Sequence, residues 1–222
     1  SDQLVSIGLT EDVFIEAVCG AGKSEIVLEL VSCALEKGLR VGWMIARRQV
    51  VLQLSERLSS IFSNLKVIGV AGEQTSELDG DLIVLTAHQL YCYPHAFDLV
   101  IVDEPDAYPF KDNVLLHGLL EVACKGTKIY LTATPDKHLM DDIKNHLRLD
   151  RRPHNRKLVV PSVYKSLKTL CFIRLLSLLR RLDKVLIFVP TRKEAKQLGW
   201  ILRCPYVTSK SRNKENIIDK FD

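Results

Sequence analysis

Short apolar runs rich in β-branched residues alternate along the chain with segments whose apolar residues recur at helical spacing. The runs predict strands at residues 13–18, 40–46, 66–72, 81–86, 98–104 and 128–134. Helices are expected between them at residues 24–37, 49–62 and 113–125. The strand runs are apolar at consecutive positions, as in strands covered on both faces. The pattern therefore predicts an α/β fold with a parallel, doubly wound sheet.

The pattern changes in the second half of the chain. A helix is expected over residues 136–147, and residues 148–164, with two prolines and five Lys/Arg, are typical of an inter-domain connection. Beyond it we expect a helix at 166–182, a strand at 184–190, a helix at 192–203, a strand-like segment at 206–209 and a helix at 213–222. Two strands do not complete a domain of this kind. We therefore predict a first domain over residues 1–150, a basic linker over 151–168 and an incomplete second domain over 169–222.

The net charge of +4 conceals a strong asymmetry between the two halves of the sequence. Residues 1–136 carry 10 Lys/Arg and 19 Asp/Glu, whereas residues 137–222 carry 21 and 8. The balances are −9 and +13, so the second half favours a polyanionic partner. A solvated basic surface is the alternative.

Composition excludes several classes of protein. Apolar residues make up 47% of the chain, enough for a buried core. No run of about 18 uncharged apolar residues occurs, so no membrane span is expected, and the acidic N-terminus is unlike a signal peptide. The six cysteines are widely spaced without a C-x-x-C pair, which favours a reduced, cytoplasmic protein over a disulfide framework or a metal cluster.

A glycine-rich turn between the first expected strand and helix predicts a phosphate site. Ala17-x-x-x-x-Gly22-Lys23-Ser24 fits the P-loop pattern, with alanine in its first glycine position. Glycines let the backbone approach phosphates closely, and the following helix points its positive end at them. Lys23 is expected to neutralise the β- and γ-phosphates, and Ser24 to bind Mg²⁺. An ordinary glycine-rich turn is the alternative. The expected nucleotide contacts are Cys19, Gly20, Ala21, Gly22, Lys23, Ser24 and Glu25.

A second motif, "LVIVDEPD" from Leu99, places two carboxylates at the carboxyl end of an expected strand, where α/β sheets bind ligands. We expect Asp103 to hold Mg²⁺ and Glu104 to orient and deprotonate the attacking water; together with Lys23 they are the predicted catalytic residues. In "YLTATP", Thr132 and Thr134 end another strand and are expected to hydrogen-bond towards Asp106, coupling nucleotide state to domain movement. For the two carboxylates the alternative is a solvated acidic turn, and for either threonine it is a helix cap.

The order GAGKS, DEPD, TAT resembles superfamily 2 helicases, and among these the chain is most similar to the ComFA family, ATP-driven DNA translocases of natural transformation. The resemblance spans nearly the whole chain. It is carried by "AVCGAGKSE", "ARRQVVLQLSERL", "LTAHQLYCYPHAFDLVIVDEPDAYPF", "LTATP", "RRPHNRKLVVP" and "KVLIFVPTRKEA".

The resemblance implies two RecA-like domains, the second incomplete here, with ATP and Mg²⁺ between them and single-stranded DNA across their top. The DNA contacts that it implies are Arg47, Arg48, Thr86, His88, Gln89, Thr191 and Arg192. For the basic connection, including Arg152 and Arg156, DNA contact and plain solvation are both open. A solvated helix start is the alternative for Arg47 and Arg48, and a structural role for His88.

The resemblance also implies partner proteins, and the sequence lacks some features of the family. A ComFC-type phosphoribosyltransferase-like protein and a membrane DNA channel are expected partners, which would bring a cytoplasmic motor to the inner membrane face; a homo-oligomer is compatible with this. The family's four-cysteine zinc site, adenine-recognising glutamine segment and arginine finger have no counterpart in this sequence. Because such an arginine is worth roughly 10³–10⁵ in rate, the chain alone is expected to bind ATP but hydrolyse it poorly.

The leading hypothesis is an ATPase, acting on an acid anhydride, that drives movement on single-stranded DNA during DNA uptake. Two alternatives remain open. One is a superfamily 2 helicase of replication restart or repair. The other is a nucleotide-gated nucleic-acid-binding module, against which Glu104 counts because a switch does not need a catalytic carboxylate.

Overall fold

The computed structural model describes residues 2–18, 21–72, 77–134, 143–149, 160–208, 211 and 217. The chain divides into two compact units, Ser1–Lys157 and Leu158–Asp222.

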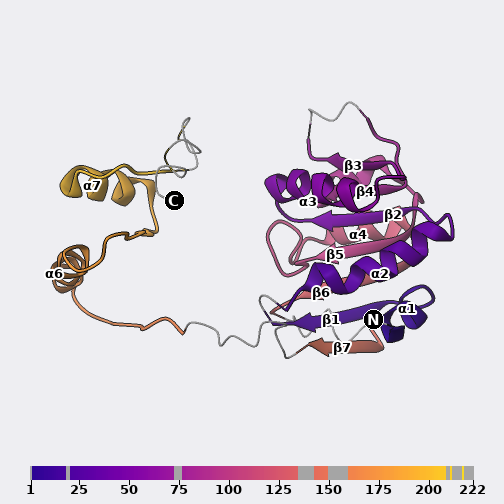
Figure 1. The fold of residues 1–222 in the computed structure, drawn as a ribbon, viewed down its shortest axis with the longest axis horizontal. Helices are drawn as coiled ribbons and strands as arrows, with labels where there is room; N and C mark the ends of the chain where they lie inside the picture. The colour runs from indigo at the N-terminus through magenta and orange to yellow at the C-terminus, as the bar shows by residue number, and fades with distance from the viewer. Residues whose placement is uncertain are drawn as a thin grey trace. The chain divides into compact units, whose positions relative to one another are not determined.

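The first unit is built on a parallel sheet of seven strands in the order β3-β4-β2-β5-β6-β1-β7 (Figure 1). The strands are β1 Val13–Ala17, β2 Val41–Ile45, β3 Val67–Val70, β4 Leu82–Thr86, β5 Phe97–Asp103, β6 Cys124–Thr132 and β7 Asn145–Leu149. The helices are α1 Asp2–Gly8, α2 Lys23–Glu36, α3 Arg48–Ile61 and α4 Val114–Ala123, with the 3₁₀ helix η1 at Ala87–Cys92. Because the strands are parallel, their carboxyl ends meet along one edge of the sheet.

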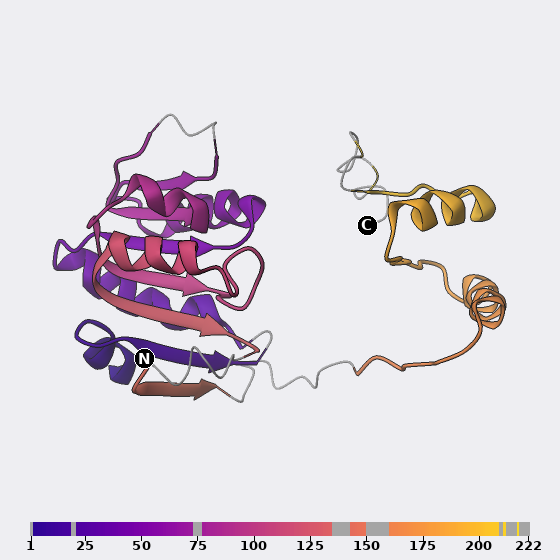
Figure 2. The ribbon, with the colours of Figure 1, turned by 180° about the vertical axis from the view of Figure 1, so that it is seen from behind.

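The sheet is buried on both faces, as its consecutive apolar runs predict. Alternate strand residues such as Trp43 and Ile101 pack with α1, α2 and α3, and those between them, such as Met44 and Val102, pack with η1 and α4. Figure 1 shows α2 and α3 in front of the sheet, and Figure 2 shows α4 on the opposite face. The alternation of β and α elements along the chain therefore produces two helical layers around one sheet.

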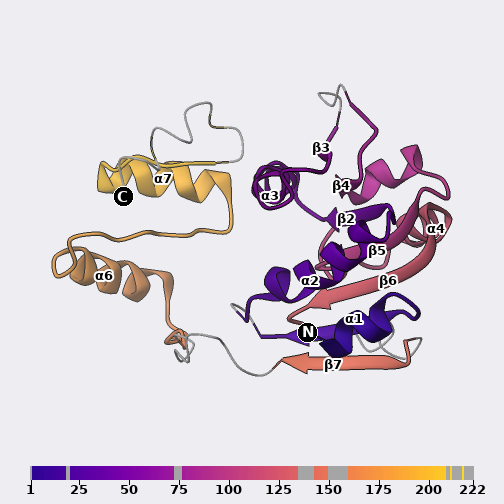
Figure 3. The same cartoon turned by 45° about the vertical axis from the view of Figure 1, so that its right-hand side comes forward.

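Strand β7 corrects the helix expected over residues 136–147. The part of that expected helix at residues 136–142 lies outside the described residues. Asn145–Leu149 forms a strand that extends the sheet beside β1, with Val13 opposite Asn145 and Ala17 opposite Leu149 (Figure 3). Leu147 and Leu149 pack against the core, while His146 and Arg148 are exposed. This alternation has a period of two, and pairing with β1 satisfies backbone groups that a helix would have paired internally.

The second unit contains α6 Lys168–Leu179 and α7 Arg192–Leu202. The strands expected at 184–190 and 206–209 are wrong for the part of the unit that the structure describes, where neither segment pairs with another. An apolar run becomes a strand only when a neighbour accepts its hydrogen bonds. Thr191 caps the start of α7, where its hydroxyl accepts from the Glu194 backbone N–H at 3.2 Å and donates to the Glu194 carboxylate at 2.9 Å. The helix expected at 213–222 lies outside the described residues except for Ile217.

Candidate functional site

The turn between β1 and α2 has the geometry that a phosphate site requires. Gly22, the residue before α2, has φ +76° and ψ +41°, a left-handed conformation that glycine adopts readily. As a glycine it gives the helix no side-chain cap, and the positive end of α2 attracts anions to the first turn. The Ala21 N–H donates to the Val18 carbonyl at 3.0 Å and closes the turn. Cys19 and Gly20 lie outside the described residues.

The acidic motif lies at the same edge of the sheet. Asp103 ends β5 and is paired with Ile45 in β2 and Leu131 in β6. It follows Leu99 and Ile101 at alternate positions, so it lies on the face covered by α2. Burial raises its pKa to about 6, against the attraction of Lys23 and with the added repulsion of Glu104. The charge of Lys23 therefore acts on Asp103, and the predicted sharing of one nucleotide by the phosphate turn and the acidic motif stays a prediction.

Glu104 has a backbone conformation that the sequence did not reveal. Its φ is +56°, in the left-handed region that non-glycine residues seldom occupy. The conformation is held by the Glu104 N–H, which donates to the Leu131 carbonyl at 2.9 Å, and by the Glu104 carbonyl, which accepts from the Ala107 N–H at 3.0 Å. The chain thereby turns immediately after Asp103 and presents Glu104 as an exposed carboxylate. Residues held in such conformations concentrate at functional sites.

The hydrogen bonds expected between the acidic loop and the end of β6 are present. Thr132 donates to one oxygen of Asp106 at 2.5 Å, and Thr134 donates to the other. The Thr134 N–H in turn donates to the Thr132 hydroxyl at 3.0 Å. Burial opposes ionisation of Asp106, but these two side-chain bonds, with a contribution from Lys23, hold its pKa below the ordinary value. The role of this network in coupling stays a prediction.

An ion pair that sequence reasoning missed lies beside the phosphate turn. Arg57, in the third turn of α3, donates from Nη2 to Glu25 Oε1 at 2.7 Å. This bond, together with one from the backbone, lowers the pKa of Glu25, which is therefore an anion at neutral pH. The two residues are 32 positions apart, and no motif links them, so only the packing of α3 beside α2 reveals the pair.

The candidate nucleic-acid contacts of the first unit also follow the carboxyl ends of strands. Exposed Arg47 and Arg48 follow β2, while Thr86 ends β4 and is followed in η1 by His88 and Gln89. Because β2 and β4 are neighbours, with Ile45 opposite Thr86, the two groups begin at adjacent places on this edge. In the second unit, Thr191 caps α7 and Arg192 begins it. Arg152 and Arg156 lie outside the described residues.

The residues present fit a magnesium–triphosphate group in their chemistry. Asp103 and Ser24 provide the oxygen ligands that Mg²⁺ prefers, and Lys23 provides a cation for phosphate. Within the described ranges, no group of three or more His, Cys, Asp or Glu side chains is placed to hold a metal by itself. Among the helices that the structure describes, none has the length and apolar character to cross a membrane.

Comparisons with known proteins agree with the motifs. Residues 9–137 match the family model of the type III restriction enzyme, res subunit. The competence protein ComFA of Bacillus subtilis is 35% identical over 163 residues, covering 70% of this chain and 35% of that protein. ComFA of Streptococcus pneumoniae is 35% identical over 167 residues, covering 71% of this chain and 38% of that protein. These matches confirm the resemblance to ComFA, although the chain spans little more than a third of either relative.

One solved structure supports the fold. The crystal structure of a hypothetical ATP-dependent RNA helicase from Sulfolobus tokodaii aligns with a TM-score of 0.55 at 17% sequence identity, covering 90% of this chain and 66% of that one. At this identity the likeness concerns the fold alone. Together with the parallel sheet it confirms the predicted α/β, RecA-like helicase fold.

Proposed function

The chain belongs to the family of the type III restriction enzyme res subunit, and we propose on this premise that its first unit binds ATP and Mg²⁺ as part of a motor that moves on single-stranded DNA. The observation that carries the proposal is the placement of the two motifs: β1, which precedes Lys23, and β5, which ends at Asp103, flank β6 in one parallel sheet. The charge of Lys23 also favours the ionised forms of Asp103 and Asp106. One cation and two carboxylates at the carboxyl edge of a parallel sheet match the needs of a magnesium nucleotide.

Each residue has a distinct part in this function. Lys23 and the first-turn N–H groups of α2 hold the β- and γ-phosphates, while Ser24 and Asp103 hold Mg²⁺. When bound, Mg²⁺ neutralises charge that develops on the phosphate oxygens. Glu104 accepts the proton of the attacking water, and its exposed, turned position supports that role. Asp106, tied to Thr132 and Thr134, transmits the state of the site to the end of β6.

On the first unit, the proposed nucleic-acid contacts are Arg47, Arg48, Thr86, His88 and Gln89. Separate contacts are proposed for Thr191 and Arg192 on the second unit and for Arg152 and Arg156 in the basic connection. Phosphate contacts from arginines hold single strands without reading their sequence. The affinity is expected to fall by about 0.7 log units per log unit of salt for each phosphate neutralised. Both relatives are named competence proteins, and this name supports extending the proposal to DNA uptake in natural transformation. In that setting a ComFC-type protein and a membrane channel are partners, and they hold the motor at the inner face of the membrane.

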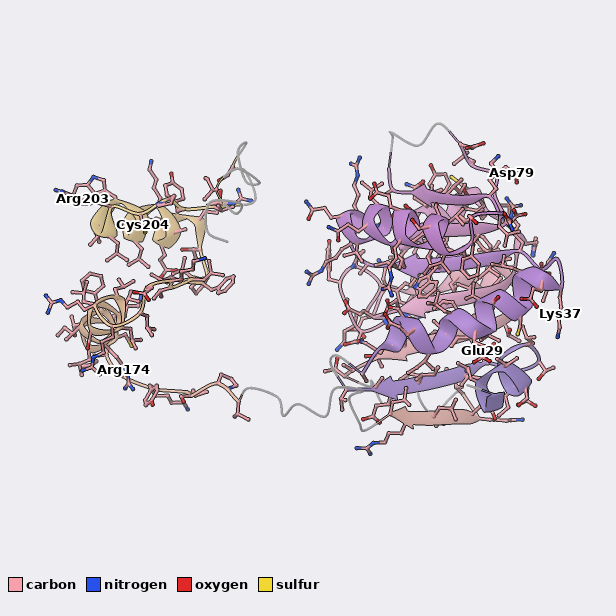
Figure 4. The ribbon with its side chains drawn as sticks, in the orientation of Figure 1. Glu29, Lys37, Asp79, Arg174, Arg203 and Cys204 are labelled. Atoms are coloured by element: carbon pink, nitrogen blue, oxygen red, sulfur yellow. The ribbon has the colours of Figure 1, made fainter. Side chains whose placement is uncertain are left out.

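The first test is nucleotide binding by the chain itself. Isothermal titration with MgATP is expected to show one site in the wild type, and Lys23→Ala is expected to abolish it. Lys37→Ala is the matched control, because Lys37 lies after the opposite end of α2 (Figure 4). Absence of binding in a folded wild-type chain refutes the proposed function.

The second test concerns hydrolysis and is made on the full-length protein with single-stranded DNA. Glu104→Gln is expected to retain MgATP binding while its DNA-stimulated phosphate release falls at least about a hundredfold, because a general base contributes typically 10²–10⁴-fold. Turnover that survives this change contradicts the assignment of Glu104. Movement without duplex unwinding favours the import motor, whereas unwinding favours a helicase of restart or repair.

A further inference from the structure

The Glu25 carboxylate lies against the phosphate turn itself. A Cβ atom placed on Gly22 would be 3.3 Å from Glu25 Oε2, so the Glu25 side chain folds back towards the residue that precedes α2. The positive end of a helix attracts any nearby anion, and here that anion belongs to the protein. A bound triphosphate requires the same region. Glu25, left alone, therefore lowers the affinity of the turn for phosphate by like-charge repulsion.

Arg57 is the residue that balances this charge. Its Nη2 lies 2.7 Å from Glu25 Oε1, the distance of a charge-assisted hydrogen bond. The contact joins α3 to the first turn of α2, and it holds the carboxylate from the side of the neighbouring helix. The side chains are 52% and 54% exposed, and ion pairs at this exposure contribute little to folding stability. The consequence of the contact therefore lies mainly in the potential at the turn.

We propose that Arg57 is a positioning residue for nucleotide binding, which holds and neutralises Glu25 so that this carboxylate does not repel the phosphates. The inference rests on the proposed function, because it concerns the same ATP site. It assigns Arg57 an action through Glu25 and no direct contact with the nucleotide. This difference can be measured, since an arginine that contacts phosphate is needed whether or not Glu25 is charged.

The test compares MgATP affinities of five chains by titration calorimetry at low salt: wild type, Arg57→Ala, Glu25→Gln, the double variant and Arg57→Lys. Removing Arg57 is expected to weaken binding about five- to tenfold, the effect of one uncompensated charge in a partly screened setting. Glu25→Gln is expected to tighten MgATP binding, because it removes the Glu25 carboxylate and leaves the positive charge of Arg57 near the turn. The double variant is expected to regain most of the lost affinity, and Arg57→Lys to lose little. All of these differences shrink as salt is raised.

Lys66 and Glu77 form the matched control pair. Their ion pair is 2.5 Å long, with side chains 46% and 58% exposed, and Lys66 precedes β3 at the amino edge of the sheet. Lys66→Ala removes a comparable surface ion pair far from the turn and is expected to leave MgATP affinity unchanged. Thermal unfolding monitored by circular dichroism verifies that each variant is folded.

Three outcomes overturn the inference, and each is distinct. Equal affinity of Arg57→Ala and wild type shows that the pair has no effect on the site. A double variant as weak as Arg57→Ala shows that Arg57 acts directly on the nucleotide. A folded wild type that does not bind MgATP refutes the proposed function and this inference with it.

Discussion

Thr132 Oγ1 donates a hydrogen bond of 2.5 Å to Asp106 Oδ1 and so ties the buried end of β6 to the acidic loop that follows β5. Thr134 donates to the second oxygen of the same carboxylate. Both threonines therefore hold one anion that also lies within the electrostatic reach of Lys23. A change in charge at the phosphate turn acts on Asp106 and, through these bonds, on the end of the neighbouring strand.

Replacing Thr132 with valine removes the buried half of this network. The free energy of unfolding is expected to fall by about 1–3 kcal/mol, because Asp106 loses a donor in a site where burial already opposes its ionisation. Urea denaturation measures the effect. Thr134→Ala, at an exposed bond, is the control and is expected to show a smaller loss. An equal loss in the two variants contradicts the importance of the buried bond.

Asp103 is expected to make stability depend on pH. Its pKa is about 6 when folded and near 3.8 when unfolded, so the folded chain binds the proton more tightly. Stability therefore falls as pH rises from about 4 to about 6, and the ionised form costs about 2–3 kcal/mol above that window. Asp103→Asn is expected to unfold at higher urea than wild type at pH 8, with a smaller advantage at pH 4.5. The measurement is made without nucleotide and with a chelator; an advantage that shrinks as pH rises refutes the assignment.

Two substitutions of Glu104 are expected to affect folding stability differently while both abolish activity. At φ +56°, glycine avoids the steric cost that a side chain bears in the left-handed region, so Glu104→Gly is expected to stabilise the fold by up to about 1 kcal/mol. Glu104→Gln keeps the backbone cost and is expected to leave stability unchanged. Chemical denaturation measures stability, and phosphate release by the full-length protein measures activity, which both variants lose. A destabilised Glu104→Gly chain would show that the carboxylate, rather than the backbone, fixes this turn.

Two glycines of neighbouring elements are expected to respond in opposite ways to alanine. A Cβ on Gly126 in β6 would lie 1.9 Å from the Asp98 carbonyl oxygen, where the pairing of β5 and β6 shifts register. Gly118, in the middle of α4, has nothing within 4 Å of its Cβ position. Gly118→Ala is expected to stabilise the chain by about 0.5–1 kcal/mol through helix propensity. Gly126→Ala is expected to destabilise it severely, because backbone must move; thermal unfolding of the two variants checks the contrast.

Most of the first unit followed from local patterns. Consecutive apolar residues predicted six of its seven strands, because strands covered by helices on both faces have no polar side. The error at Asn145–Leu149 arose since a short segment with two leucines suits either a helix or an edge strand, and the free edge of β1 decided between them. The apolar run at 184–190 shows the converse, because without a paired neighbour its β propensity does not produce a strand.

The sequence by itself determined the chemistry of the candidate site, since the glycine turn, the lysine, the acid pair and the threonines are local motifs that end strands of a parallel sheet. The sequence also determined that the carboxyl ends of the strands that carry these motifs would meet at one edge of the sheet. Only the tertiary structure decided the left-handed turn at Glu104, the rise in the pKa of Asp103 on burial and the pairing of Arg57 with Glu25. These depend on which groups from distant segments share a low-dielectric or crowded space, and that is a property of packing rather than of sequence order.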